Sequence, residues 1–260
     1  KTKKSEEIEQ QIEQDKSQLI NSKETRSALS SELTVLTDME TRREGINNAV
    51  KNILRQKSSE SGKYEYVQAM VADAITADIE YAGVIEAALE GKTDSLIVNN
   101  SSALFADKET QDKLDGRVNF ICTDRIIPFV DSTDLSKFQS VKGRVADLVK
   151  YDSQYAPLVW NLLGKTLLVD SIDSAAEMMN QLSDEYKFVT QKGELLTSTG
   201  SVKFGPVGKA AGLISRKSRL NQLNDALDNI TKQISTTQNQ ISQSQQTSEH
   251  LSKLRKELRT

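Results

Sequence analysis

"YAPLVWNLLGKTLLV", residues 155–169, repeats the pattern of "YAGVIEAALEGKTDSLIV", residues 81–98. In each copy, Tyr-Ala opens a stretch with apolar residues three or four positions apart, which predicts an amphipathic helix. Gly-Lys-Thr follows the helix, and an apolar run that is typical of a buried strand comes next. The two copies predict two related subdomains within one mixed α/β domain.

Gly-Lys-Thr is also the sequence that ends the phosphate loops of nucleotide-binding proteins. A phosphate loop needs a glycine five residues before the Gly of Gly-Lys-Thr and a helix after it. Here those positions hold Glu86 and Val159, and each Gly-Lys-Thr closes a helix. We therefore expect neither turn to bind a nucleotide. We interpret Gly91 and Gly164 as caps at helix C-termini, where glycine accepts a positive φ.

The region around the repeat contains further short elements of both kinds. Strands are expected at 67–72, 95–98, 118–122, 166–169 and 187–190, and helices at 79–89, 154–163 and 174–182.

The two ends of the chain differ from this middle region. All aromatic residues, 6 Tyr, 6 Phe and 1 Trp, lie between Tyr64 and Phe204. The ends are rich in Gln, Ser, Lys and Glu, so they can form solvated helices but not a core of their own. Each end carries apolar residues in a heptad register, which predicts a coiled coil. The seam residues are Ile8, Ile12, Leu19, Leu29, Leu33, Leu36, Val50 and Leu54, and Leu220, Leu223, Leu227, Ile230, Ile234, Ile241, Leu251 and Leu258.

Polar residues interrupt both seams, among them Asp15 and Thr237, so we expect locally weak packing. A helix of about 50 residues is roughly 75 Å long, longer than a small domain can cover. We therefore predict that the two end helices pair antiparallel with each other and carry the globular region at their tip. The alternative is two independent helices, each packing on a partner chain.

Residues suited to catalysis or metal binding are few. Cys122 is the only cysteine and reads as a small core residue, and the lone His250 lies in the polar C-terminal helix. Asp170 and Asp173 follow a strand, where Asp173 is more simply a helix N-cap. Without a partnered nucleophile, we expect no catalytic site. No run of about 18 apolar residues is present, which indicates a cytoplasmic protein.

The arrangement of helix, two-part domain and returning helix resembles the hinge region of structural maintenance of chromosomes (SMC) proteins, most closely the bacterial form. The stretches that carry the resemblance are the first repeat copy, "FICTDRI" (120–126), "LVKYDSQYAPLVWNLLGKTLLVDSIDSA" (148–175) and "FVTQKGELLTSTGSVKFG" (188–205). The resemblance implies an α+β hinge of two subdomains joined to an antiparallel coiled coil. It places the outgoing helix at 1–58, the hinge at 59–214, with subdomains near 64–140 and 141–214, and the returning helix at 215–260.

In this family, a glycine-rich segment at the end of the hinge lies where two hinges join. Gly200 and Gly205 match the second glycine of each family pair, whereas Thr199 and Phe204 replace the first. The resemblance thus implies a homodimer whose interface includes Gly200, Val202, Phe204 and Gly205. The substituted glycines put the usual backbone geometry of that interface in doubt.

The family's ATPase heads would lie outside this sequence, since it contains no complete phosphate loop and begins at Lys1 without a methionine. We therefore expect no enzymatic activity and no cofactor in this chain. ATP, Mg²⁺ and kleisin-type subunits are expected only at the heads. The resemblance further implies a role in chromosome condensation and segregation at the nucleoid.

Residues 195–224 contain no acidic residue, although the chain as a whole has a net charge of −3. Such a basic segment predicts salt-dependent, sequence-independent contact with DNA phosphates. The predicted contacts are Lys203, Lys209, Arg216, Lys217 and Arg219, together with Arg55, Lys57 and Lys63 from the outgoing helix. The alternative function is a monomeric nucleic-acid-binding module on a coiled-coil arm, and an enzyme with a helical hairpin is a remote third option.

Overall fold

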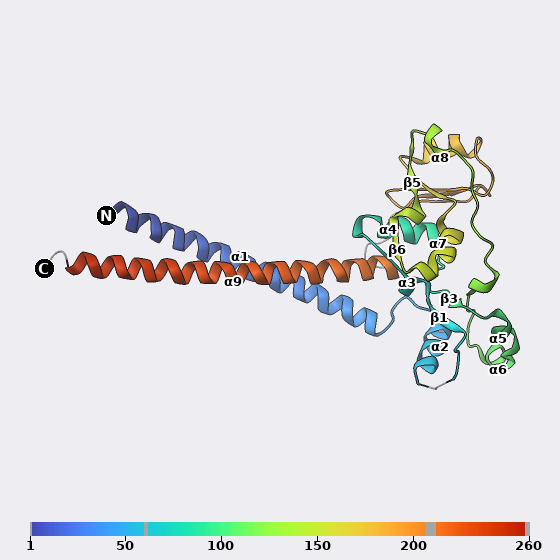
Figure 1. Cartoon of the computed structure of the whole chain (residues 1–260), viewed down its shortest axis with the longest axis horizontal. Helices are drawn as coiled ribbons and strands as arrows, with labels where there is room; N and C mark the ends of the chain where they lie inside the picture. The colour runs from blue at the N-terminus through green and yellow to red at the C-terminus, as the bar shows by residue number, and fades with distance from the viewer. Residues whose placement is uncertain (1, 60–61, 206–211, 258–260) are drawn as a thin grey trace. The chain divides into compact units, whose positions relative to one another are not determined.

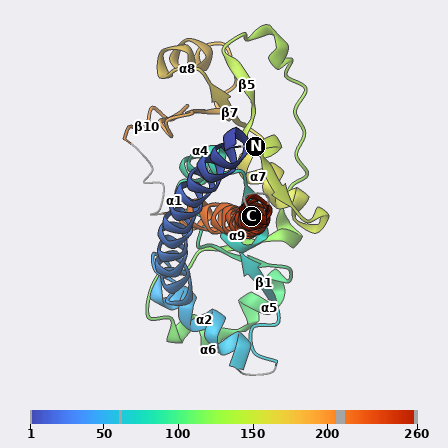
Figure 2. The same cartoon turned by 90° about the vertical axis from the view of Figure 1, so that its left-hand side faces the viewer.

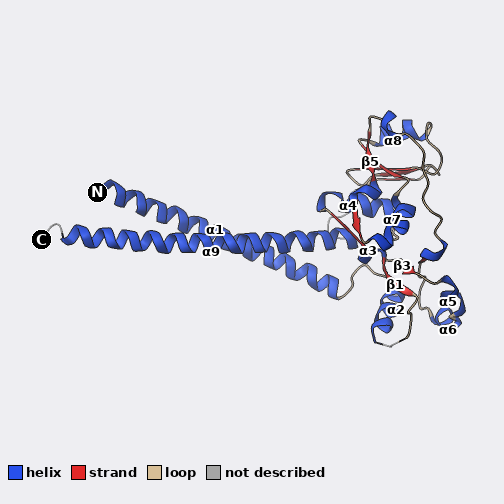
Figure 3. Ribbon diagram, in the orientation of Figure 1, coloured by secondary structure: helices blue, strands red, loops and turns tan. Residues whose placement is uncertain are grey.

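The structure of the protein, a computed structural model, describes residues 2–59, 62–205 and 212–257. The chain divides into two compact units (Figures 1 and 3). One combines Lys1–Glu40 with Leu220–Thr260, and the other is Thr41–Arg219. The first unit is helical, and the second contains all of the described strands.

The first unit consists of helix α1 (Thr2–Thr41) and most of helix α9 (Leu213–Glu257). The two helices run in opposite directions, so that the first residues of α1 and the last residues of α9 lie at the same end of the pair (Figure 2). Seam residues from both helices are buried, and so are two of the polar interruptions. Ile12, Asp15, Leu36, Ile234, Thr237 and Ile241 are each less than 9 % exposed. The predicted antiparallel pairing is confirmed, and so is the seam where its residues lie on α1 and α9. The predicted seam residue Leu258 lies outside the described residues.

The sequence pattern predicted one continuous outgoing helix to residue 58, and this prediction is wrong. The helix ends at Thr41, and a second helix, α2 (Asn48–Ser59), begins after the six residues 42–47. Arg43 and Gly45 have φ values of 51° and 84°, a left-handed conformation that an α-helix does not accommodate. Val50 and Leu54 therefore leave the coiled-coil seam and pack in the core of the second unit.

The first half of the second unit is built on a three-stranded sheet with the order β1-β3-β4. Strand β3 pairs antiparallel with β1 and parallel with β4. A parallel pair needs a crossover connection, which here is formed by two short helices. The elements are β1 (Val67–Met70), α3 (Val71–Ala74), α4 (Ile79–Leu89), β3 (Leu96–Val98), α5 (Ser101–Ala106), α6 (Lys108–Lys113) and β4 (Phe120–Cys122).

The second half contains a five-stranded sheet with the order β10-β9-β8-β7-β5. Strands β7 and β8 are parallel, and the other pairs are antiparallel. The elements are β5 (Val141–Arg144), α7 (Ala156–Leu163), β7 (Thr166–Val169), α8 (Ile172–Met179), β8 (Lys187–Thr190), β9 (Leu195–Thr197) and β10 (Val202–Lys203). Short 3-10 turns occupy Thr123–Arg125, Leu135–Lys137, Val145–Leu148 and Ser153–Tyr155.

The two halves share one hydrophobic core. Strand β2 (Ile75–Ala77) pairs with β6 (Val149–Tyr151), and a large buried cluster takes residues from both halves, including Ile85 on α4 and Leu158 on α7. A smaller cluster lies between α8 and the five-stranded sheet. The repeat is visible in this arrangement, because α4-β3 and α7-β7 each lead from a helix into a strand that pairs in parallel with the next one. The domain is α+β, as predicted.

The two repeat glycines play different structural roles. At the first turn, Glu90 and Gly91 adopt φ values of 51° and 81°, so Gly91 meets the predicted left-handed geometry. Gly164, in contrast, has φ −63° and ψ −29° and remains right-handed. The predicted positive φ at Gly164 is wrong, because the turn there continues the helical geometry of α7.

Candidate subunit interface and nucleic-acid contact region

Strand β10 forms one edge of the five-stranded sheet. Val202 and Lys203 pair with Leu196 and Leu195 of β9, and no further described strand lies beyond them. Val202 is 43 % exposed and the adjoining Phe204 is 69 % exposed. An open strand edge with exposed apolar side chains is a surface on which another chain can pair. The structure thus places all four predicted interface residues, Gly200, Val202, Phe204 and Gly205, on one hairpin and its continuation.

The two glycines at this hairpin are explained by backbone conformation. Gly200 has φ 83° and Gly205 has φ 106°, both in the left-handed region that favours glycine. A Cβ atom at either position would meet no atom of the described residues within 4 Å. Within the described chain, neither glycine is required by close packing, so both positions are open to a neighbouring molecule.

The predicted DNA contact at Arg216 is wrong, because this residue is buried. Its side chain is 1 % exposed at the start of α9, and its NH2 group donates a hydrogen bond to the carbonyl of Glu44 at 2.7 Å. A buried guanidinium cannot reach a phosphate without unfolding its surroundings. In sequence this arginine looks like part of a basic surface, but Ile214 and Ser215 beside it are buried as well.

Lys57 and Lys217 are both half-buried and bond to backbone carbonyls. Lys57 donates to the carbonyls of Val67 and Gln68, and Lys217 donates to the carbonyl of Asp73 at 3.1 Å. These hydrogen bonds hold α2 and α9 against the two ends of the β1-α3 segment. The two ammonium groups therefore have a structural role in addition to their positive charge.

Lys203 lies on β10, where it shares the carboxylate of Glu90 with Lys187. Lys203 is 3.4 Å from Glu90, and Lys187 makes a closer ion pair with the same side chain. Burial acts to raise the pKa of Glu90, but the hydrogen bond and charge of Lys187, with a contribution from Lys203, hold this pKa below its usual value. The carboxylate remains charged, so it offsets part of the positive charge on this edge.

The remaining predicted DNA contacts that the structure describes lie on different elements. Arg55 is exposed on α2 and donates to Asn52, Lys63 lies over the ring of Tyr64 at 5.5 Å, and Arg219 is half-buried on α9. Lys209 lies outside the described residues. The basic stretch that is continuous in sequence is thus distributed over β10, the buried start of α9 and residues without a described position.

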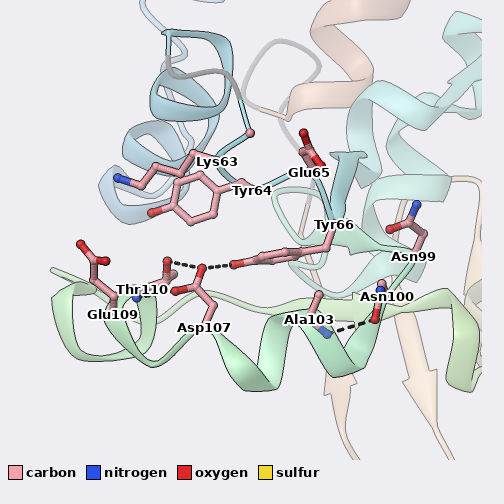
Figure 4. A pocket seen from close by; sticks show the side chains of 11 residues that line it. Lys63, Tyr64, Glu65, Tyr66, Asn99, Asn100, Ala103, Asp107, Glu109 and Thr110 are labelled. Atoms are coloured by element: carbon pink, nitrogen blue, oxygen red, sulfur yellow. Dashed lines mark hydrogen bonds between the residues drawn. The ribbon is translucent and has the colours of Figure 1, made fainter.

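An open pocket of about 900 Å³ lies between the Gly62–Tyr66 turn and helices α5 and α6 (Figure 4). The Asp107 carboxylate accepts hydrogen bonds from the Tyr66 hydroxyl at 2.8 Å and from the Thr110 hydroxyl and backbone N–H at 2.7 and 3.0 Å. Burial first, and then the bond to Asp107, raise the pKa of Tyr66 well above its usual value. Burial acts to raise the pKa of Asp107, but the hydrogen bonds of Thr110 and Tyr66 hold it below its usual value. These groups satisfy one another and hold α6 against β1.

A second exposed apolar surface was missed by the sequence analysis. Ile127 and Val130 are each 80 % exposed on the segment that joins the two halves, whereas Phe129 between them packs against Trp160 at 5.1 Å between ring centroids. The signal in the sequence is the run "RIIPFV", residues 125–130, in which a proline interrupts apolar residues outside any strand pattern. Phe129 anchors the segment, and its neighbours are left in solvent.

Neither a metal site nor a membrane span is found in the part of the chain that the structure describes. Within residues 2–59, 62–205 and 212–257, no three His, Cys, Asp or Glu side chains are grouped so that they could hold a metal ion. None of the described helices is long and apolar enough to cross a bilayer.

Comparison with known proteins matches this chain to one family, both through a family model and through individual relatives. Residues 65–179 match the family model "SMC proteins Flexible Hinge Domain". The chain is 30 % identical over 209 residues to the chromosome partition protein Smc of Rhodopirellula baltica and 26 % identical over 195 residues to that of Bacillus subtilis. The alignments cover 80 % and 73 % of this chain but only 17 % and 16 % of those proteins.

Solved structures agree with the fold. The hinge domain of Geobacillus stearothermophilus SMC, crystallised as an asymmetric dimer, has a TM-score of 0.75 at 22 % identity, covering 92 % of this chain and 97 % of that one. The Pyrococcus furiosus SMC hinge has a TM-score of 0.50 at 28 % identity, covering 66 % of this chain and 87 % of that one.

Proposed function

Since this chain is an SMC hinge domain with adjoining coiled-coil helices, we propose that it joins two SMC subunits into a dimer through the open edge of β10. The observation that carries this proposal is the pair of exposed apolar residues, Val202 and Phe204, at a sheet edge on which no further described strand pairs. A second chain that covers this edge would bury apolar surface, and it would also supply hydrogen-bond partners for the outer backbone groups of β10.

The related hinge of Geobacillus stearothermophilus is described as a dimer, which supports the same assembly here. Gly200 and Gly205 fit this role, because positions without a Cβ atom let a second backbone approach closely. Phe204, which replaces a family glycine, adds apolar contact area at the same place.

Sedimentation equilibrium at micromolar concentration tests the dimer directly. The expected mass is twice the 28.9 kDa of the chain. Phe204→Ser removes the most exposed aromatic ring of this edge and is expected to weaken the dimer at least tenfold, because a buried aromatic side chain contributes a few kcal/mol. The matched control is Phe105→Ser, which changes another exposed ring, on α5. A wild-type chain that sediments only as a monomer would favour the monomeric binding module instead.

We further propose that the hinge contacts DNA without sequence preference, through basic residues other than Arg216. Arg55 supports this proposal because it is exposed, and Lys203, Lys209, Lys217 and Arg219 add positive charge in a segment that has no acidic residue. Arg216 is left out because it is buried. Phosphate contacts of this kind release counterions, so affinity should fall steeply with salt.

Fluorescence anisotropy with a duplex of random sequence tests this second proposal. The double variant Arg55→Glu with Lys209→Glu is expected to bind several-fold more weakly and to lower the slope of log K against log salt by about 0.9 for each lost contact. Lys137→Glu, an exposed charge reversal elsewhere in the domain, is the control. Equal affinity and slope for all three proteins would remove DNA contact from these positions.

The name of the related proteins, chromosome partition protein Smc, supports a role of the whole protein in chromosome condensation and segregation at the cytoplasmic nucleoid. We propose that ATP, Mg²⁺ and kleisin-type subunits are bound by head domains outside this sequence. The chain itself would then contribute the subunit junction and no enzymatic step.

A further inference from the structure

Glu86 is a buried carboxylate that lies in the middle of α4 and bonds to the start of α9. The side chain is 8 % exposed. Its Oε1 atom accepts a hydrogen bond from the backbone N–H of Ile214 at 3.1 Å, and Oε2 accepts one from the Ser215 hydroxyl at 2.6 Å. Glu86 therefore joins a helix of the hinge core to a helix that begins more than 120 residues later in the chain.

The position of this carboxylate matches what a helix start requires. The first N–H groups of a helix have no partner within the helix, and its N-terminus carries a partial positive charge. Helix α9 has no acidic residue in its own first turn. Glu86 supplies the missing acceptor and the negative charge from α4.

Gly212 makes room for this contact. A Cβ atom at position 212 would overlap the carboxylate of Glu86, so any larger residue there would displace it. The glycine is thus required by close approach of a side chain.

The following residues of α9 are also bonded to the domain. In addition to the Arg216 and Lys217 bonds described above, the Ser218 hydroxyl donates to the carbonyl of Ala77 at 2.8 Å. The boundary between the two compact units falls after Arg219. The first turns of α9 therefore belong to the hinge domain, and the same helix continues without a break into the coiled-coil unit.

The other connection to the coiled-coil unit is built differently. Helix α1 ends at Thr41, and the turn that leads to α2 contains left-handed residues at Arg43 and Gly45. One arm helix thus leaves the domain as a continuous helix with a buried cap, and the other is interrupted.

We propose that Glu86 is a positioning residue that locks the start of α9 into the hinge domain. This inference rests on neither dimerisation nor DNA contact.

Hydrogen–deuterium exchange on the whole chain tests the lock. Glu86→Ala is expected to speed exchange of the amides of residues 214–218 at least tenfold, while the amides of β7 keep their protection. Glu86→Gln retains the acceptor without the charge and should give an intermediate effect. Gly212→Ala should reproduce the Glu86→Ala pattern, because its methyl group occupies the site of the carboxylate.

Glu80→Ala, an exposed glutamate on the same helix, is the matched control and should leave exchange at 214–218 unchanged. Unchanged exchange at 214–218 in both Glu86→Gln and Glu86→Ala would overturn the proposal. An equal rise in β7 and α9 would overturn it too, since Glu86 would then support the whole domain rather than one helix start.

Discussion

The ring of Phe129 lies where a side chain at position 164 would be. A Cβ atom built on Gly164 would come within 2.6 Å of Phe129 and would also overlap the carbonyl oxygen of Trp160. Glycine at this turn is therefore required because the segment that joins the two halves, residues 125–131, packs on α7 through Phe129. At the equivalent Gly91, no atom of the described residues lies within 4 Å of the Cβ position, and glycine is required there by its φ of 81°.

Gly164→Ala is expected to destabilise the domain by about 2 kcal/mol, because overpacking forces Phe129 and the backbone of α7 to shift. Gly91→Ala should cost about 1–2 kcal/mol through its left-handed conformation. The two effects can be separated with Phe129→Ala, which should relieve the clash at position 164 but not the strain at position 91. Urea unfolding of the double variants measures the coupling, and additive effects at position 164 would contradict the packing explanation.

Asp131, two residues after Phe129, holds the same segment to Arg144 and Tyr186 of the second half. It accepts hydrogen bonds from Tyr186 and, at 2.6 Å, from Arg144, and the side chains of Asp131 and Arg144 are 5 % and 14 % exposed. Burial acts to raise the pKa of Asp131, but the hydrogen bonds from Tyr186, Thr133 and Arg144 hold it well below its usual range. Asp131→Asn is expected to cost about 3 kcal/mol at pH 7, because Arg144 loses a buried partner.

The pH dependence at Asp131 has a defined sign. A carboxylate with a depressed folded pKa stabilises the protein above its unfolded pKa of about 3.9, and this contribution is lost as pH falls toward the folded pKa. Wild-type protein should thus lose more stability between pH 5 and pH 2 than Asp131→Asn in chemical denaturation. Asp134→Asn, an exposed neighbour, should retain the wild-type slope.

Tyr66→Phe removes the hydroxyl that bonds to Asp107 and is expected to destabilise the domain by about 2 kcal/mol, as for a hydrogen bond to a charged group. The pKa of Tyr66 is raised in the folded state, so its contribution is complete below the unfolded value of about 10 and is lost as pH rises toward the folded pKa. The wild type should therefore lose more stability than the variant between pH 9 and pH 12. Tyr81→Phe on α4 is the control, and equal alkaline slopes for the wild type and Tyr66→Phe would refute this assignment.

Arg216→Glu is expected to destabilise the domain by more than about 3 kcal/mol, since it reverses a buried charge. Arg55→Glu, on the exposed face of α2, should change stability by less than about 0.5 kcal/mol. Thermal unfolding followed by circular dichroism compares the two. Equal melting temperatures would show that Arg216 is accessible. If the expected result holds, weaker DNA binding by an Arg216 variant would report unfolding and not a lost phosphate contact.

Local patterns in the sequence were sufficient to predict most of the helices and strands near the repeat. Helix α4 and strands β7 and β8 have the predicted bounds, because each is a continuous apolar or amphipathic run that ends at turn residues. Strands β2, β5, β6, β9 and β10 were not predicted, because runs of two to four residues acquire their conformation from pairing with distant partners. The break after Thr41 was hidden for a related reason, since Val50 and Leu54 continue the heptad spacing of a coil that they do not join.

The sequence by itself determined the α+β class, the repeated helix-turn-strand unit, the pairing of two amphipathic end helices and the family resemblance, because all of these depend on residue spacing along the chain. The tertiary structure decided which role each residue of the same type has. It buried Arg216 while leaving Arg55 exposed, and it assigned Gly91 to backbone strain and Gly164 to the approach of Phe129. It also placed Glu86 at the start of α9. Burial and close approach arise from segments far apart in the chain, so the spacing of neighbouring residues cannot encode them.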